Sequence, residues 1–218
     1  MKKKVYTLML CAMLGTATLA GCGSNPADAE VPQDSVAATI TVDKEGLPPL
    51  SPELQDLYTG AYKIYNQISF GKFDYDPETK IEKDGFDYYK ITDSRFSTYA
   101  DFKTYLEQYF TKDFVSNSIL GESNIMFTEG EDGGLYFLGG GRGSNIFYAG
   151  HVFEADRETE KEIDFKATAY YTNSNEAYDG DLFYTAPENP DDYTTQEFRF
   201  IVLKEDGAWK FDDFALFF

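Results

Sequence analysis

The hydrophobic and polar positions of the chain follow a helical period first and a strand-like period later. Between Leu54 and Ile68, apolar side chains recur at intervals of three or four residues. The segment Ser51-Pro52-Glu53 before them offers an N-cap residue, a proline at the first helical position and an acidic residue in the first turn. This pattern predicts an amphipathic helix of about 17 residues that begins after Ser51.

Two shorter helices are predicted next, each preceded by a threonine that can cap it. Thr98 precedes a segment in which Phe102 and Leu106 share one helical face, and Thr111 precedes a segment that ends at Gly121. The residues 86–91, which follow Asp84-Gly85, are rich in aromatic side chains and indicate a strand before these helices.

From about residue 125 the apolar positions alternate with a period of two. Residues 125–128 and 135–138 flank Glu131-Asp132-Gly133-Gly134, which predicts a hairpin. Further strands are predicted at 146–153, 163–171, 198–202 and from Trp209 onward, with Phe217 in the alternation of the last strand. Helices that precede a run of antiparallel strands favour an α+β domain, in which the helices pack on one face of a curved antiparallel sheet.

The N-terminus carries the most specific motif of the chain. Lys2, Lys3 and Lys4 precede an apolar stretch from Val5 to Leu19, too short for a comfortable membrane span. The following Ala20-Gly21-Cys22 completes a pattern that resembles the bacterial lipobox. The resemblance implies cleavage after Gly21 and lipidation of Cys22; the alternative is an ordinary secretory signal with a cysteine there by chance.

These features divide the chain into a signal peptide at 1–21, a flexible tether at 22–50 and a single domain at 51–218. The tether is expected because prolines and small polar residues dominate it without a sustained period. A lipid anchor at Cys22 would place the protein on the extracytoplasmic face of the cell membrane. Cys11 would be removed with the signal peptide, so the mature domain would hold no free thiol.

Composition and charge limit the classes of partner that the protein can bind. The 218 residues include 19 Lys and Arg against 38 Asp and Glu, a formal charge of −19 and an isoelectric point near 4.3. Cleavage after Gly21 would remove three lysines and no acid, which makes the mature chain more acidic still. Such a surface repels phosphate backbones, so nucleic acid is not expected as a partner. Aromatic residues make up 17%, too many for a disordered acidic chain.

A glycine-rich segment at 139–144 is the first candidate contact site. It follows a predicted strand but precedes another strand, and the Lys-Ser/Thr pair of a phosphate-binding loop is absent, so a glycine-rich hairpin connection is the simpler interpretation. Arg142 is one of few cations in the domain, and its guanidinium can clamp a carboxylate. Ser144 and Asn145 lie beside it and complete the candidate loop.

His151 and Tyr148 form a second candidate binding position on the following strand. The chain has one histidine and no G-x-S-x-G motif, so a nucleophilic triad and a zinc site are not expected. Paired carboxylates such as Asp212-Asp213 arise by chance among 38 acids, and the loop at 173–181 does not have the spacing of an EF-hand. We therefore expect no catalytic residue, no metal and no cofactor.

Several segments together resemble a known family. They are Tyr89-Lys90-Ile91, the run from Phe102 to Phe114, Asp132-Gly133-Gly134-Leu135-Tyr136 and the closing Gly207-Ala208-Trp209-Lys210-Phe211-Asp212-Asp213-Phe214. With the lipobox they are similar to the IseA-like DL-endopeptidase inhibitors of Gram-positive bacteria. The closing motif also resembles NTF2-like and cystatin-like lipoprotein domains, which implies that type of fold.

The resemblance implies a non-enzymatic protein that covers the active-site cleft of a peptidoglycan hydrolase. Cell-wall hydrolases are commonly basic, and an acidic domain would be steered toward them. The alternative is a binding module for a small ligand or a peptide, with tyrosines lining a pocket. An enzyme of unrecognised type is the third hypothesis.

Overall fold

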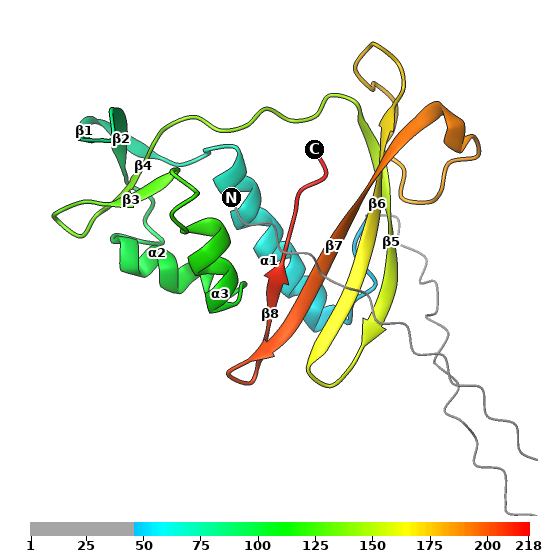
Figure 1. The fold of residues 1–218 in the computed structure, drawn as a ribbon, viewed down its shortest axis with the longest axis horizontal. Coiled ribbons are helices and arrows are strands. Elements are labelled where there is room, and N and C mark those ends of the chain that lie inside the picture. The colour runs from blue at the N-terminus through cyan, green and yellow to red at the C-terminus, as the bar shows by residue number, and fades with distance from the viewer. Residues whose placement is uncertain (1–45) are drawn as a thin grey trace, which may run out of the picture. The chain divides into compact units, whose positions relative to one another are not determined.

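The computed structural model describes residues 46–218, and these residues confirm the predicted α+β class (Figure 1). They contain three α-helices and two antiparallel sheets of four strands each. The predictions for the signal segment, Cys22 and most of the tether lie outside the described residues. The last part of the expected tether is not free of the domain, because Gly46, Pro48 and Leu50 are buried.

Helix α1 (Pro52–Ser69) has the apolar stripe that the sequence predicts. Its buried positions are Leu54, Tyr58, Ala61, Ile64 and Ile68. Pro52 occupies the first turn as expected, but the Ser51 side chain makes no capping hydrogen bond. The main-chain oxygen of Ser51 instead accepts from the Gln55 amide at 2.9 Å, the ordinary helical bond.

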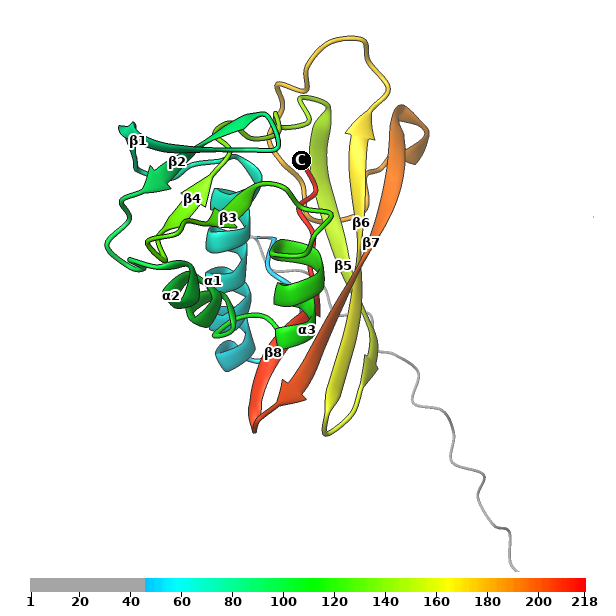
Figure 2. The same cartoon turned by 60° about the vertical axis from the view of Figure 1, so that its left-hand side comes forward.

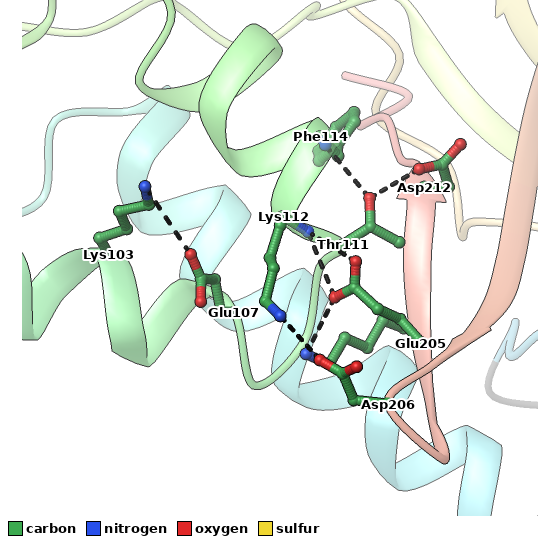
Figure 3. A network of polar contacts seen from close by, with 9 residues as sticks. Lys103, Glu107, Thr111, Lys112, Phe114, Glu205, Asp206 and Asp212 are labelled. Atoms are coloured by element: carbon green, nitrogen blue, oxygen red, sulfur yellow. Dashed lines mark hydrogen bonds and ion pairs between the residues drawn. The ribbon is translucent and has the colours of Figure 1, made fainter.

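Helices α2 (Tyr99–Leu106) and α3 (Lys112–Phe114) are capped by the two predicted threonines. The Thr98 hydroxyl accepts from the Asp101 amide at 3.0 Å, and Asp101 accepts from the Thr98 amide at 3.1 Å, which forms a capping box. The Thr111 hydroxyl accepts from the Phe114 amide at 3.1 Å (Figure 3). A π-helical turn at Val115–Ile119 continues α3.

The smaller sheet has the strand order β1-β2-β4-β3, from β1 (Tyr75–Lys83), β2 (Phe86–Ile91), β3 (Phe127–Glu129) and β4 (Leu135–Phe137). The hairpin between β3 and β4 and the strand β2 were predicted. Strand β1 was not, because its side chains are mostly polar and exposed and because it contains Pro77. The pairing of β1 with β2 is irregular between Asp76 and Lys80, and an edge strand tolerates a proline at such a place.

The larger sheet is an antiparallel meander in the order β5-β6-β7-β8. Its strands are β5 (Tyr148–Glu158), β6 (Glu162–Thr172), β7 (Tyr193–Glu205) and β8 (Ala208–Asp213), with a 3-10 turn at Pro190–Asp192 before β7. On β6 the predicted face is buried, from Ile163 through Phe165 and Ala167 to Ala169. Phe217 is outside the last strand, which ends at Asp213, and is buried in the segment that follows.

Two features differ from the predicted single curved sheet. The strands form two sheets, and the glycine-rich segment connects β4 of one to β5 of the other rather than closing a hairpin.

All three helices lie on one side of the larger sheet, as expected (Figures 1 and 2). The centre of the Tyr58 ring on α1 lies 6.0 Å from the centre of the Phe153 ring on β5 and 6.1 Å from that of the Phe211 ring on β8. Helix α1 and this sheet therefore share one hydrophobic core.

Candidate functional site: a tyrosine-lined cavity

A cavity of about 250 Å³ lies between α1 and the larger sheet. Five separate segments form its walls: the residues before α1, the helix itself, β5, the loop before β7 and the C-terminal segment. The lining residues are Gly46, Leu47, Tyr58, Thr59, Tyr62, Tyr148, His151, Leu182, Tyr184, Phe217 and Phe218. Because the walls come from residues spread over most of the domain, only the folded chain assembles the cavity.

No acidic or basic side chain other than His151 lines this cavity. The walls are apolar side chains and aromatic rings, and the polar groups are hydroxyls and one imidazole. Transferring an isolated charge into such surroundings is costly when no opposite charge compensates it. The cavity is therefore suited to an uncharged occupant.

His151 is a buried and neutral member of the wall. Its Nε2 atom lies 2.8 Å from the main-chain oxygen of Gly46, and its Nδ1 atom lies 2.6 Å from the Tyr148 hydroxyl. Burial lowers the pKa of His151 to about 4, and the bond to Gly46 only partly opposes this. Neither ring nitrogen is left to act as a base, because both already have hydrogen-bond partners.

Three tyrosine hydroxyls in the cavity are available to a ligand. Those of Tyr58, Tyr62 and Tyr184 make no hydrogen bond with any described residue. Burial raises the pKa of Tyr58 and of Tyr62, and the neighbouring hydroxyls of Tyr62 and Tyr184, respectively, raise each further. The hydroxyls of Tyr58 and Tyr62 therefore stay protonated and can donate hydrogen bonds at any physiological pH.

The loop before β7 covers one side of the cavity because glycine allows it to approach β5. The Phe183 amide donates to the Ala149 oxygen at 3.1 Å, and the His151 amide donates to the Phe183 oxygen at 3.0 Å. A Cβ atom at Gly150 would overlap the main-chain oxygen of Phe183. These bonds hold Leu182 and Tyr184 against the cavity.

The structure separates the residues that the sequence proposed for binding. Tyr148 and His151 lie together in the cavity. Arg142 lies in the wall of a different cavity, and its guanidinium donates to the main-chain oxygen of Phe218. Ser144 is exposed, and Asn145 has a local role, because its side chain accepts from the Phe147 amide at 3.0 Å.

Most residues that line the tyrosine-lined cavity could not be predicted from the sequence. Tyr58 and Tyr62 stand four residues apart on α1, which places them on one helical face, but aromatic residues at that spacing usually indicate core packing. Gly46 was assigned to the tether, and nothing near Tyr184 in the sequence distinguishes it from other loop tyrosines. No local pattern could have identified these two residues.

The described residues contain no group of three or more side chains that could hold a metal ion, and among them no helix is long and apolar enough to cross a membrane. Comparison with known proteins finds neither a family model nor a curated protein that matches this chain.

Proposed function

We propose that this protein is a non-enzymatic binding protein whose tyrosine-lined cavity holds a small, uncharged and mainly apolar ligand. The observation that carries this proposal is the combination of apolar walls with three unpaired tyrosine hydroxyls. A ligand with hydrogen-bond acceptors would satisfy these hydroxyls, while its apolar part would replace water against Leu47, Leu182 and Phe217.

The size of the cavity limits the ligand. About 250 Å³ is slightly below the range of roughly 300–1,000 Å³ that is typical of small-molecule sites. A compound with one or two rings fits this volume better than an extended peptide. This argument favours a small molecule over a peptide within the same binding hypothesis.

The test compares two probes of similar shape and different charge by titration calorimetry at about 150 mM salt, an ionic strength that screens surface charges. We expect 1-naphthol to bind and the cationic 1-naphthylmethylammonium ion to bind at least tenfold more weakly. Tyr58→Phe and Tyr62→Phe should each weaken 1-naphthol about fivefold or more, since each removes one hydrogen bond. Tyr89→Phe, outside the cavity, is the matched control. Equal or tighter binding of the cation would overturn the proposal.

A second candidate function is the inhibition of a basic cell-wall DL-endopeptidase, and one observation favours it. The loop at 140–146 is exposed along its length, and Ile146 at its end is 57% exposed. The negative charge of the domain would attract a basic enzyme, and the exposed side chain of Ile146 would then offer it an apolar contact. Hydrolysis of cell-wall peptides should slow when the protein is added and recover in Ile146→Asp. An unchanged rate with the unmodified protein would exclude this candidate.

The location of the protein is a separate proposal that rests on the motif at Cys22. A lipid anchor there would hold the domain at the extracytoplasmic face of the membrane. The variant Cys22→Ala should move from the membrane fraction to the soluble or secreted fraction, and the unmodified chain should incorporate labelled palmitate. Membrane retention of Cys22→Ala would contradict the anchor.

A further inference from the structure

Another cavity, of about 440 Å³, is lined by residues of the smaller sheet and, unlike the tyrosine-lined cavity, by charged side chains. We call it the acidic cavity. Three carboxylates line it: Asp84 from the turn between β1 and β2, Glu122 from the segment before β3, and Glu129 from β3. Lys83 is the one basic residue among the described residues that line it. A cavity whose charges are mainly of one sign concentrates ions of the opposite sign, which here are cations.

None of the three carboxylates has a partner within residues 46–218. Each belongs to an exposed residue, and none makes a hydrogen bond or an ion pair with a described residue. Lys83 forms no ion pair with any of them; its ammonium group instead donates to the Thr128 hydroxyl oxygen at 3.0 Å. The oxygens of all three carboxylates therefore remain available to a cation that enters the cavity.

Tyr88 supplies an unpartnered polar group to the acidic cavity. This residue of β2 is only 3% exposed, and its hydroxyl makes no hydrogen bond with a described residue. Among the described residues that are not exposed, the one side-chain oxygen or nitrogen that is both unpartnered and fully covered is Asp164 Oδ1. The Tyr88 hydroxyl is therefore not fully covered, and because Tyr88 lines the cavity, this hydroxyl opens into it. Its oxygen can accept a hydrogen bond from a ligand there.

The carboxylates of the acidic cavity act on both tyrosines that line it. Burial raises the pKa of Tyr88, and the charge of Asp84 raises it further. Burial likewise raises the pKa of Tyr99, at the start of α2, and the charge of Glu129 adds to this shift. Both hydroxyls therefore remain neutral, and each lies in the field of a carboxylate. Tyrosine rings also attract cations through their electron-rich faces.

We propose that the acidic cavity binds a small linear diammonium cation. Three carboxylates against one lysine leave an excess of two negative charges, which two ammonium groups would balance. A single metal ion suits the cavity less well, because the described residues contain no group of three acidic side chains that could hold one. An ammonium group has three donors and no acceptor, so the carboxylates and the Tyr88 hydroxyl oxygen are the partners it needs.

The apolar part of the lining fits the alkyl chain of such a ligand. Leu120, Ile125 and Phe127 line the same cavity, and Ile125 is 50% exposed. An alkyl chain that covers these side chains removes apolar surface from water, which favours binding. The volume of about 440 Å³ lies within the range of roughly 300–1,000 Å³ that is typical of small-molecule sites.

The test is a titration of the full chain with 1,5-diaminopentane at about 50 mM salt, followed by the ring signals of Tyr88 and Tyr99 in NMR spectra. We expect these signals to shift and to saturate in the millimolar range, because the carboxylates are exposed and partly screened. Pentylamine has the same chain and one charge, and it should bind at least about threefold more weakly. The uncharged 1,5-pentanediol should not bind.

Substitutions of single carboxylates locate the site. Asp84→Asn and Glu129→Gln should each weaken 1,5-diaminopentane about threefold, since each removes one negative charge from the cavity. Asparagine tolerates the left-handed backbone that Asp84 adopts, with a φ angle of 53°, so this variant keeps the turn. Glu78→Gln is the matched control: it removes an exposed carboxylate of β1 that does not line the cavity, and it should leave binding unchanged.

Two further variants test the other polar groups of the acidic cavity. Lys83→Gln removes the positive charge but keeps a donor for Thr128, so it should strengthen 1,5-diaminopentane about twofold. The same variant would weaken the binding of an anion. Tyr88→Phe keeps the ring and removes the hydroxyl oxygen, which should weaken the diamine about threefold.

Three results would overturn the proposal. They are shifts that grow without saturation, binding of pentylamine or 1,5-pentanediol that equals that of the diamine, and equal losses in Glu78→Gln and Glu129→Gln. The last result would show that the acidic surface as a whole attracts the diamine. If Tyr88→Phe is too unstable to titrate, the exposed carboxylate variants still decide the outcome.

The acidic cavity and the tyrosine-lined cavity can fail separately. Tyr58→Phe should leave 1,5-diaminopentane binding unchanged, and Glu129→Gln should leave 1-naphthol binding unchanged, because each residue lines only one of the two cavities. Binding of 1-naphthylmethylammonium in the acidic cavity would be weakened by Glu129→Gln and not by Tyr58→Phe, so it can be distinguished from binding in the tyrosine-lined cavity.

Discussion

The Nδ1 atom of His151 lies 2.6 Å from the hydroxyl oxygen of Tyr148, three residues earlier on the same strand. The Nε2 atom of the same ring lies 2.8 Å from the main-chain oxygen of Gly46. A carbonyl oxygen only accepts hydrogen bonds, so Nε2 carries the proton and the tyrosine hydroxyl donates to Nδ1. The neutral imidazole thus joins the residues before α1 to β5 inside the cavity.

The first prediction is the titration of His151. It is the only histidine of the chain, so its imidazole signals can be followed by NMR without ambiguity. Because burial lowers its pKa to about 4, the signals should stay those of a neutral ring between pH 7 and pH 5. A midpoint near 6.5 would show that the ring is exposed to water and that the cavity wall is open.

The same pKa has a consequence for stability. In the unfolded chain the histidine takes up a proton as the pH falls through about 6.5, whereas in the folded chain it does so only near pH 4. The unfolded state therefore binds more protons in this window, and stability falls as the pH drops from about 6.5 to 4, by up to about 3 kcal/mol. In His151→Gln this part of the pH dependence should be absent, as denaturant unfolding at several pH values would show.

The second prediction concerns the Tyr148 hydroxyl. Tyr148→Phe leaves the buried Nδ1 acceptor of His151 without a donor, which should lower the free energy of unfolding by about 1–3 kcal/mol. Tyr89→Phe is the control, because that hydroxyl has no hydrogen-bond partner among the described residues and its loss should cost no more than about 0.5 kcal/mol. Equal stabilities of the two variants in urea unfolding would contradict the bond.

The third prediction concerns the contact between Gly150 and Phe183. Gly150→Ala should push the loop away from β5, break the two main-chain bonds there and weaken 1-naphthol binding severalfold. Gly143→Ala is the control, because its Cβ would meet no atom within 4 Å. Amide hydrogen exchange at Phe183 and His151 should accelerate in Gly150→Ala and stay slow in Gly143→Ala. Unchanged exchange in both variants would disprove the role of Gly150.

Features that depend on neighbouring residues could be predicted, and features that depend on distant ones could not. The caps at Thr98 and Thr111 and the buried face of β6 follow from patterns within a few residues. The strand β1 could not be predicted because an exposed edge strand lacks the apolar alternation on which prediction relies. The cavity joins Gly46 to residues about 100 and 140 positions away, a proximity that no local pattern encodes.

The fourth prediction concerns Thr111, whose hydroxyl forms hydrogen bonds with residues of two secondary-structure elements. It accepts from the Phe114 amide and donates to the Asp212 carboxylate at 2.6 Å, which ties α3 to β8 (Figure 3). Thr111→Val keeps the shape but removes both bonds, so the free energy of unfolding should fall by about 2 kcal/mol. Thr104→Val, which removes an exposed hydroxyl on α2, should cost well under 1 kcal/mol. A smaller loss for Thr111→Val than for Thr104→Val would refute this role.

The last prediction concerns Asp164, an acidic side chain that is only 4% exposed on β6. Its Oδ2 atom lies 2.7 Å from Arg199 Nη2, while its Oδ1 atom has no hydrogen-bond partner within residues 46–218. Arg199→Met would leave a buried carboxylate without a cation, and because Arg199 is half exposed we expect a loss of about 1–3 kcal/mol rather than the larger cost of a fully buried pair.

Arg157→Met is the matched control, since it breaks an exposed pair with Glu162 and should cost less than about 1 kcal/mol. In the double variant Asp164→Asn with Arg199→Met, no uncompensated charge remains, so part of the stability should return. Thermal unfolding of these variants gives the comparison directly. If the double variant is less stable than Arg199→Met alone, the cost does not arise from the buried charge.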